Sequence, residues 1–269
     1  MTTIKFEMKF DSGESNFEGL NLYYGADALG GMAEAISITT HAIINNEVIK
    51  QTPSTRGFSL NFKQAFEGSY RQKFELTFTD VEALRVVKYL KVGGFIELLS
   101  FHLGSPLGVS VKIESDSARR WARTYMTEGE ELIERLARPL DRIHHPIYGQ
   151  GYQAYLLKSR TNIIGFNQRT YDFLSGAETS ANREFIEVAV SRFNTRTGTG
   201  RFIEDENSES ISFTPFRKFS LSRIQKNALA NSLKDLANDR ITKLRAEVTR
   251  VNARDGRTKY YRLHSIYEI

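Results

Sequence analysis

Apolar and polar residues alternate in three short runs of the N-terminal half, which predicts strands there. Every second residue from Ile4 to Phe10 is apolar and the residues between are mostly charged, so we expect a half-buried strand over 3–10. The runs 58–62 and 74–78 repeat this pattern around the turn signal Glu67-Gly68-Ser69. They predict a β-hairpin with one aromatic face packed on a helix.

In the segments between and after these strands, apolar residues recur at helical spacing. One predicted helix starts at Asp27 as its N-cap and ends at Asn45-Asn46, and a second follows Asp80 over 81–91 until Gly93-Gly94 interrupts it. A long helical tract covers 115–143, where Pro139 should kink or end the helix. A short strand is expected over 109–113, and the type of the segment 152–160 stays open.

The last third of the chain contains five strand-like runs with one helical segment between the third and the fourth. The order strand, strand, strand, helix, strand, strand is typical of an OB-like β-barrel, in which closure removes exposed sheet edges. An SH3-like barrel and an antiparallel sheet covered by one helix are the alternatives. The predicted strands are 185–193, 200–204, 210–216, 244–251 and 259–266, and the predicted helix is 221–237.

The fold class expected from these patterns is α+β, with two domains. Residues 1–176 should form an α/β sandwich-like domain whose helical extension is 115–143. Residues 183–269 should form a five-stranded OB-like barrel with one helix, after the small and polar segment 176–182.

Composition limits the class and the cellular location expected for the protein. The chain has 269 residues, 40% of them hydrophobic, which suffices for two folded cores. It has no cysteine, and no apolar run approaches the length of about 20 residues that spans a membrane. Charged residues interrupt the N-terminus from Lys5 onward, unlike a signal peptide, so we expect a cytoplasmic protein without a membrane contact.

Charge is distributed unequally between the two predicted domains. Residues 184–269 hold 16 Lys and Arg against 11 Asp and Glu, whereas residues 1–183 hold 21 of each. The net charge of +5 therefore comes from the predicted barrel, which favours a polyanionic partner for it. A solvated basic surface is the alternative interpretation.

Two loops of the predicted barrel carry most of the candidate binding residues. In an OB-type barrel, ligands lie across strands two and three and the loops 1–2 and 4–5, here 194–200 and 252–257. Glycine there lets a backbone approach a phosphate, and arginine can bind it bidentately. The expected polyanion contacts are Arg192, Arg196, Arg201, Arg254, Arg257 and Lys259, and the expected base-stacking side chains are Phe202, Phe213 and Tyr260. Alternation is equally compatible with phenylalanines in the core, and the acidic stretch 204–206 would repel a polyanion.

No sequence motif indicates catalysis. A Gly-x-Ser-x-Gly elbow and a phosphate-binding loop are absent from the sequence, so no catalytic residue, metal ligand or cofactor is assigned. Adjacent residues His144 and His145 should point in different directions, and His41 should be a packed, hydrogen-bonded residue.

The first 110 residues resemble an uncharacterised family of bacterial proteins. The resemblance rests on Leu22-Tyr23-Tyr24-Gly25 at the start of a helix, on Thr40-His41 near its end, and on the hairpin around Glu67-Gly68-Ser69. It implies an N-terminal domain of unknown function followed by a five-stranded barrel, in accessory or phage-defence gene settings.

Three functions follow from the sequence as hypotheses. The first is a non-enzymatic adaptor that binds a protein partner or a second copy of itself. The second is a nucleic-acid-binding protein that acts through the basic barrel loops. The third is a hydrolase or nuclease with a dispersed active site.

Overall fold

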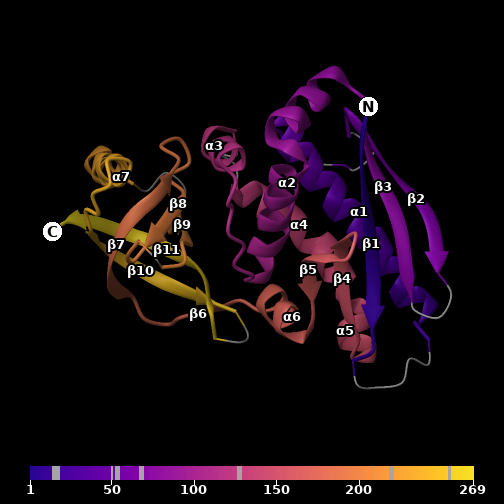
Figure 1. The fold of residues 1–269 in the computed structure, drawn as a ribbon. Helices are drawn as coiled ribbons and strands as arrows, with labels where there is room; N and C mark the ends of the chain where they lie inside the picture. The colour runs from indigo at the N-terminus through magenta and orange to yellow at the C-terminus, as the bar shows by residue number, and fades with distance from the viewer. Residues whose placement is uncertain are drawn as a thin grey trace. The chain divides into compact units, whose positions relative to one another are not determined.

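The chain forms two compact units, Met1–Leu174 and Ser175–Ile269. The computed structural model describes residues 1–13, 19–49, 51, 55–66, 70–125, 129–206, 208–217, 221–253 and 256–269. The predicted turn Glu67-Gly68-Ser69 lies outside the described residues. The predicted α+β class is confirmed, with both helices and strands in the first unit and a closed barrel in the second (Figure 1).

The N-terminal unit is built on a five-stranded antiparallel sheet of order β2-β3-β1-β4-β5. The predicted strand near the N-terminus is its centre, and the predicted hairpin forms β2 and β3. Alternation places Ile4, Phe6, Met8 and Phe10 on the buried face of the central strand. The strands are β1 (Thr2–Asp11), β2 (Phe58–Phe66), β3 (Arg71–Phe78), β4 (Gln153–Lys158) and β5 (Thr161–Phe166).

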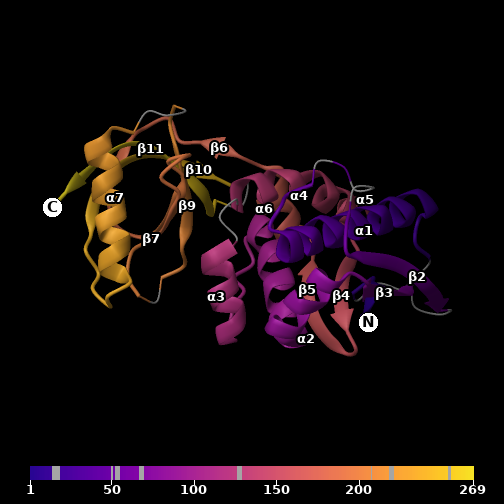
Figure 2. The same ribbon diagram turned by 90° about the horizontal axis from the view of Figure 1, so that it is seen from above.

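Helix α1 lies across one face of this sheet (Figure 2), and its buried Met32 and Ile36 join the apolar side chains of β1 in one core. The other face of β1 carries Lys5, Glu7 and Lys9. The helices of the unit are α1 (Leu22–Asn45), α2 (Val81–Gly104), the 3-10 turn η2 (Ser105–Leu107), α3 (Asp116–Tyr125), α4 (Gly129–Ile143), α5 (His145–Gln150) and α6 (Gln168–Ser175).

Three expectations for this unit are wrong in detail. The helix predicted over 81–91 does leave helical geometry at Lys91 (φ 59°, ψ 165°), where two helical parts of α2 meet at a kink, but Gly93-Gly94 lies inside the second part, whose Phe95 and Leu99 are buried in the core. The predicted strand over 109–113 has no regular structure. The predicted long helix forms α3 and α4 instead, and Pro139 lies inside α4 without ending it.

The C-terminal unit confirms the predicted closed barrel of five strands and one helix. The strands follow the order β7-β8-β9-β11-β10 around the barrel, and β10 pairs with β7 to close it. Every pair is antiparallel except β9 with β11. The elements are β6 (Glu178–Thr179), which adds to the edge of β10, then β7 (Glu184–Phe193), β8 (Gly200–Ile203), β9 (Ile211–Pro215), α7 (Arg223–Leu236), β10 (Leu244–Asn252) and β11 (Thr258–Glu268).

Helix α7 closes one side of the barrel core. Ser222 caps it in a capping box with Gln225, so one orphan amide at the helix start is bonded by a side chain. Leu229 of α7 is fully buried among barrel residues such as Val190 and Leu263. A hydrogen bond connects the helix to the barrel, because the Ser232 hydroxyl accepts from the amide of Val190 at 3.1 Å.

Candidate functional site

The two phenylalanines predicted to stack on bases are core residues. Phe202 is 1% exposed and Phe213 is fully buried, and their rings stack on each other with centroids 3.9 Å apart. Both side chains point into the barrel because they occupy the inward positions of β8 and β9. This placement removes both rings as stacking faces for a ligand, in line with the core alternative.

Arg201 is likewise engaged inside its own unit. Its guanidinium donates to Ser210 Oγ at 2.8 Å, to the Ser210 carbonyl at 2.6 Å and to Ser212 Oγ at 3.2 Å. Burial, with a smaller contribution from the neighbouring charge of Arg192, lowers the pKa of Arg201 to about 10. These bonds use its donors to hold β8 to β9 rather than to present them to a phosphate.

The other predicted barrel residues are scattered. Arg196 is exposed at the tip of the 1–2 loop, and Arg192, Arg257 and Tyr260 are half-buried. Arg254 lies outside the described residues. Lys259 donates to the Gly176 carbonyl at 3.1 Å, and burial lowers its pKa.

The glycines of the 1–2 loop serve packing. A Cβ on Gly200 would meet the carbonyl oxygen of Arg192 and would lie 2.6 Å from the Phe213 ring. Gly198 has a φ of +78° and faces Pro215 and Leu221. Glycine is therefore required here by the barrel itself, without reference to a ligand.

A cluster that sequence reasoning missed surrounds the start of helix α1. The helix begins at Leu22 rather than near Asp27, because Asn21 is the N-cap and its side chain accepts from the amides of Tyr23 and Tyr24. Asp27 therefore lies in the second turn and is available for side-chain contacts. The Asn-Leu-Tyr-Tyr sequence carries this cap signal, but the competing Asp27 obscured it.

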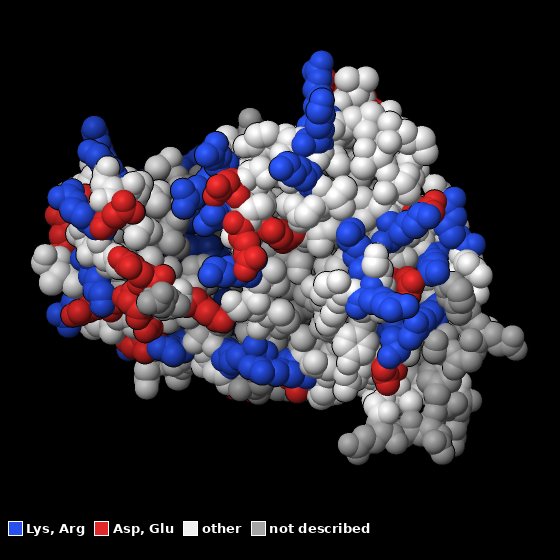
Figure 3. All heavy atoms as spheres, in the orientation of Figure 1, with Lys and Arg blue, Asp and Glu red and all other residues white. Residues whose placement is uncertain are grey.

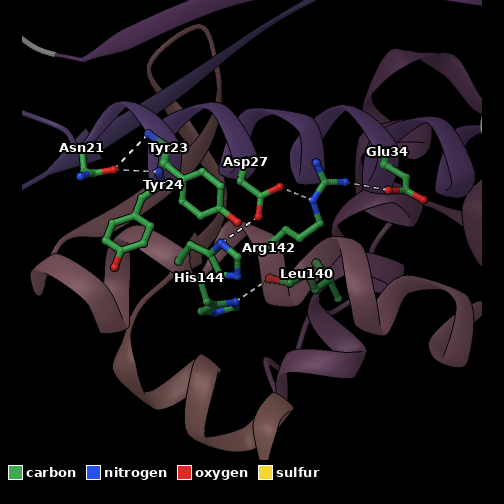
Figure 4. A network of polar contacts seen from close by, with 9 residues as sticks. Asn21, Tyr23, Tyr24, Asp27, Glu34, Leu140, Arg142 and His144 are labelled. Atoms are coloured by element: carbon green, nitrogen blue, oxygen red, sulfur yellow. Dashed lines mark hydrogen bonds and ion pairs between the residues drawn. The ribbon is translucent and has the colours of Figure 1, made fainter.

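Asp27 and Glu34 of α1 both bind Arg142 of α4 (Figure 4), and Glu34 also binds Arg135 of the same helix. Arg142 Nε lies 2.6 Å from Asp27 Oδ1, and its Nη1 lies 3.0 Å from Glu34 Oε2. Arg135 Nη2 lies 2.8 Å from the other Glu34 oxygen. All four side chains are about three-quarters buried or more, so the pairs are shielded from screening by salt.

Adjacent residues His144 and His145 point in different directions, as predicted. His145 Nδ1 lies 2.7 Å from Asp27 Oδ2. His144 is fully buried, with Nδ1 at 2.7 Å from the Leu140 carbonyl and Nε2 at 2.8 Å from Thr170 Oγ1. His41 is buried as expected, with Nδ1 at 3.0 Å from the Glu47 carbonyl.

Aromatic rings extend from this network to the surface. The Tyr23 ring stacks on His145 with centroids 6.5 Å apart, His145 meets the edge of Tyr148 at 5.4 Å, and Tyr148 lies 4.7 Å from Tyr171. Tyr23 is 70% exposed, Tyr148 is 44% exposed, and the adjacent Leu22 is 82% exposed. We call Leu22, Tyr23, His145, Tyr148 and Tyr171 the aromatic cluster.

A second feature is a shallow depression on the open face of the N-terminal sheet. Lys and Arg gather over β1, β3 and β4 on this face (Figure 3). Its volume is about 780 Å³, and its lining residues are Glu7, Lys9, Asp11, Arg71, Lys73, Tyr155, Leu157, Ser159, Arg160 and Asn162.

Within the described residues, no three His, Asp or Glu side chains form a group that could hold a metal ion. Among the helices of those same parts of the chain, none has the length and apolarity to span a bilayer.

Comparison with known proteins connects part of the N-terminal unit to a family. Residues 6–100 match the family described as a domain of unknown function (DUF7946). The match runs from β1 into α2 and so includes the start of α1 with Tyr23 and Asp27. An uncharacterised family is thereby supported for this part of the chain. No curated protein and no solved structure matches the chain.

Proposed function

We propose that the protein is a non-enzymatic adaptor whose N-terminal unit binds a protein partner through the aromatic cluster. The observation that carries this proposal is the exposure of Tyr23 and Tyr148, whose rings both contact His145 above the polar network, with the exposed Leu22 next to Tyr23 in the chain. Large apolar side chains scattered singly over a surface need no explanation, but contiguous ones favour an interaction site.

The chemistry of the cluster suits a protein partner. Tyrosine is enriched among the residues that dominate interface energies, because it buries a large area at a low cost in side-chain entropy. The His145 ring on which Tyr23 stacks is mostly buried beside Asp27, so part of the ordering cost is met before binding. A central aromatic anchor with a polar surround is the arrangement expected of a specific interface.

The barrel supplies the second binding module of the proposed adaptor. Its connectivity, with a parallel pair between the third and fifth strands and a helix before the fourth, supports the OB-like interpretation. Barrels of that type bind ligands on the face of strands two and three, here β8 and β9. An accessory or defence role for the adaptor stays a prediction from the resemblance.

Quantitative affinity purification tests the proposal. Tagged wild-type protein and the double variant Tyr23→Ser/Tyr148→Ser are expressed in the native host, and co-purifying proteins are compared by mass spectrometry. We expect a stoichiometric partner, or a second copy of the chain, that the double variant loses. The matched control is Tyr89→Ser, which removes a tyrosine that is 48% exposed elsewhere on the same unit.

Two results would contradict the proposal. One is a monomer by light scattering that retains no partner from the host. The other is a partner that both the double variant and the Tyr89→Ser control retain equally.

A further inference from the structure

The open face of the N-terminal sheet arranges basic side chains in rows across the strands. Pairing of β1 with its two neighbours places Arg71 of β3, Lys9 of β1 and Tyr155 of β4 in one row. The next row contains Lys73, Glu7 and Leu157. Since strands lie about 4.8 Å apart, the first row extends over about 14 Å as far as Gly165 on β5.

This face is basic although its unit is neutral. Residues 1–174 hold 20 Lys and Arg and 20 Asp and Glu. Six cations against three carboxylates give the open face a net charge of +3, so the rest of the unit must carry −3. The cations are Lys5, Lys9, Lys63, Arg71, Lys73 and Arg160, and the carboxylates are Glu7, Asp11 and Glu75.

The carboxylates hold the lysines in place rather than cancel the face. Lys73 lies 3.6 Å from Glu7, Lys63 lies 3.2 Å from Glu75, and Lys9 pairs with Asp11. Arg71 and Arg160 are exposed at the rim of the depression. Arginine is the side chain best suited to bind phosphate bidentately.

Tyr155 provides an aromatic surface in the middle of the basic face. Its ring atoms Cδ1 and Cε1 lie 3.4 Å from the position of a Cβ on Gly165, so the ring packs beside Gly165 of the neighbouring strand at ordinary van der Waals distance. The Lys9 ammonium lies 6.0 Å from the ring centroid. A half-buried ring flanked by cations on a sheet is the combination that stacks on unpaired bases while the cations contact the backbone.

We propose that this open face binds single-stranded nucleic acid, with Arg71 and Arg160 contacting phosphates and Tyr155 stacking on a base. A lipid surface fits less well, because membrane-binding faces expose large apolar side chains, whereas Leu157 and Tyr155 are half-buried. The proposal goes beyond the adaptor function and uses none of the residues of the aromatic cluster, so each can fail without the other.

Fluorescence anisotropy of the full chain with labelled oligo-dT and oligo-U tests the proposal. At about 50 mM salt we expect the wild type to bind and the double variant Arg71→Glu/Arg160→Glu to bind at least about tenfold more weakly. The slope of log affinity against log salt concentration should be shallower by about 1.4 in the variant, because two phosphate contacts are lost. The matched control is Lys88→Glu/Arg138→Glu, an equal change of charge at exposed positions on α2 and α4, which should bind like the wild type.

Tyr155 is tested by a pair of substitutions. Tyr155→Phe keeps the ring and should retain affinity, whereas Tyr155→Ser should lose about fivefold or more. Fluorescence of Trp121, the single tryptophan, verifies that each variant keeps the N-terminal unit folded.

Several results would overturn the proposal. They are the absence of binding at low salt, equal weakening by the helix control, and unchanged affinity in the Arg71→Glu/Arg160→Glu variant. Loss of binding confined to Arg196→Glu/Arg257→Glu would assign the nucleic acid to the barrel loops instead. Binding to phosphatidylserine vesicles or to poly-glutamate as tight as to the oligonucleotides would also exclude specificity for nucleic acid.

Discussion

Acid should destabilise the N-terminal unit through His144. Its ring is buried between α4 and α6, with Nδ1 at 2.7 Å from the Leu140 carbonyl and Nε2 at 2.8 Å from Thr170 Oγ1. A second proton on the ring would place a full charge away from water. Burial accordingly lowers the pKa of His144 from 6.5 to about 4.

The sign of the effect follows from proton counts. Between pH 6.5 and about 4 the unfolded chain binds a proton at His144 and the folded chain does not, so stability falls as the pH falls through this window. With these two pKa values, the free energy of unfolding should drop by about 2.5 kcal/mol between about pH 7 and pH 4.5. A drop of that size is a large fraction of the stability of a typical domain.

Urea unfolding monitored by Trp121 fluorescence measures the free energy of unfolding of the N-terminal unit, which contains His144. Trp121 belongs to α3, and its indole N–H donates to the Ile43 carbonyl of α1 at 3.0 Å, so its emission reports the N-terminal unit alone. Because the chain has two units, a probe confined to one of them keeps the two-state treatment valid. His144→Gln, which does not titrate, is the comparison at each pH.

The difference in stability between wild type and His144→Gln should shrink by about 2.5 kcal/mol from pH 7 to pH 4.5. Other histidines and carboxylates titrate in both proteins and cancel from this difference. A difference that stays constant with pH would refute the assignment of the acid sensitivity to His144. A larger wild-type advantage at low pH would reverse its sign and refute the buried neutral ring.

Four further substitutions test local features of the fold. Asn21→Ala removes the cap of α1 and should cost about 1 kcal/mol in the same urea assay. Gly200→Ala drives a Cβ against Phe213 and should lower barrel stability by about 2 kcal/mol or more in calorimetry, while Gly93→Ala, which meets open space, should be neutral or slightly stabilising. Phe202→Ala should cost about 3 kcal/mol of barrel stability, and a loss of ligand affinity without that cost would restore the stacking role.

The barrel was predictable because local patterns and global topology agree in it. Each of its strands is short, alternates in polarity and is bounded by turn residues, and the order of elements restricts the closed arrangements. Gly200 shows the limit of this reasoning. Its place beside arginines favours a backbone that approaches a phosphate, but its lack of a Cβ leaves room for the Phe213 ring, which belongs to the next strand, β9.

The N-terminal unit was less predictable because its features depend on contacts between distant segments. The sequence favours Asp27 as a helix cap, whereas Asn21 caps α1 in the structure. The partners of Asp27, Arg142 and His145, lie more than a hundred residues later in the chain. Similarly, β4 pairs with β1 although most of the sequence of the unit lies between them, and local periodicity carries no information about such a pairing.

A sum of charge over the sequence does not show the basic face of the N-terminal sheet. The net charge of residues 1–183 is zero, so charge favoured the barrel as the polyanion-binding module. Strand pairing then brings Arg71 next to Lys9 and places Lys73 one row further on the same face, while carboxylates such as Glu34 and Asp27 are used on the helical side. In the barrel, by contrast, Arg201 is enclosed by its own serines.

The two surfaces proposed for the N-terminal unit belong to different elements and can therefore be separated experimentally. The aromatic cluster lies on α1, α5 and α6, whereas the basic face lies on β1, β2, β3 and the β4–β5 hairpin. An adaptor that joins a protein to single-stranded nucleic acid should lose one partner with Tyr23→Ser/Tyr148→Ser and the other with Arg71→Glu/Arg160→Glu. Retention of the second ligand in each case would show that the unit links two partners, whereas loss of both in either variant would place them on one site.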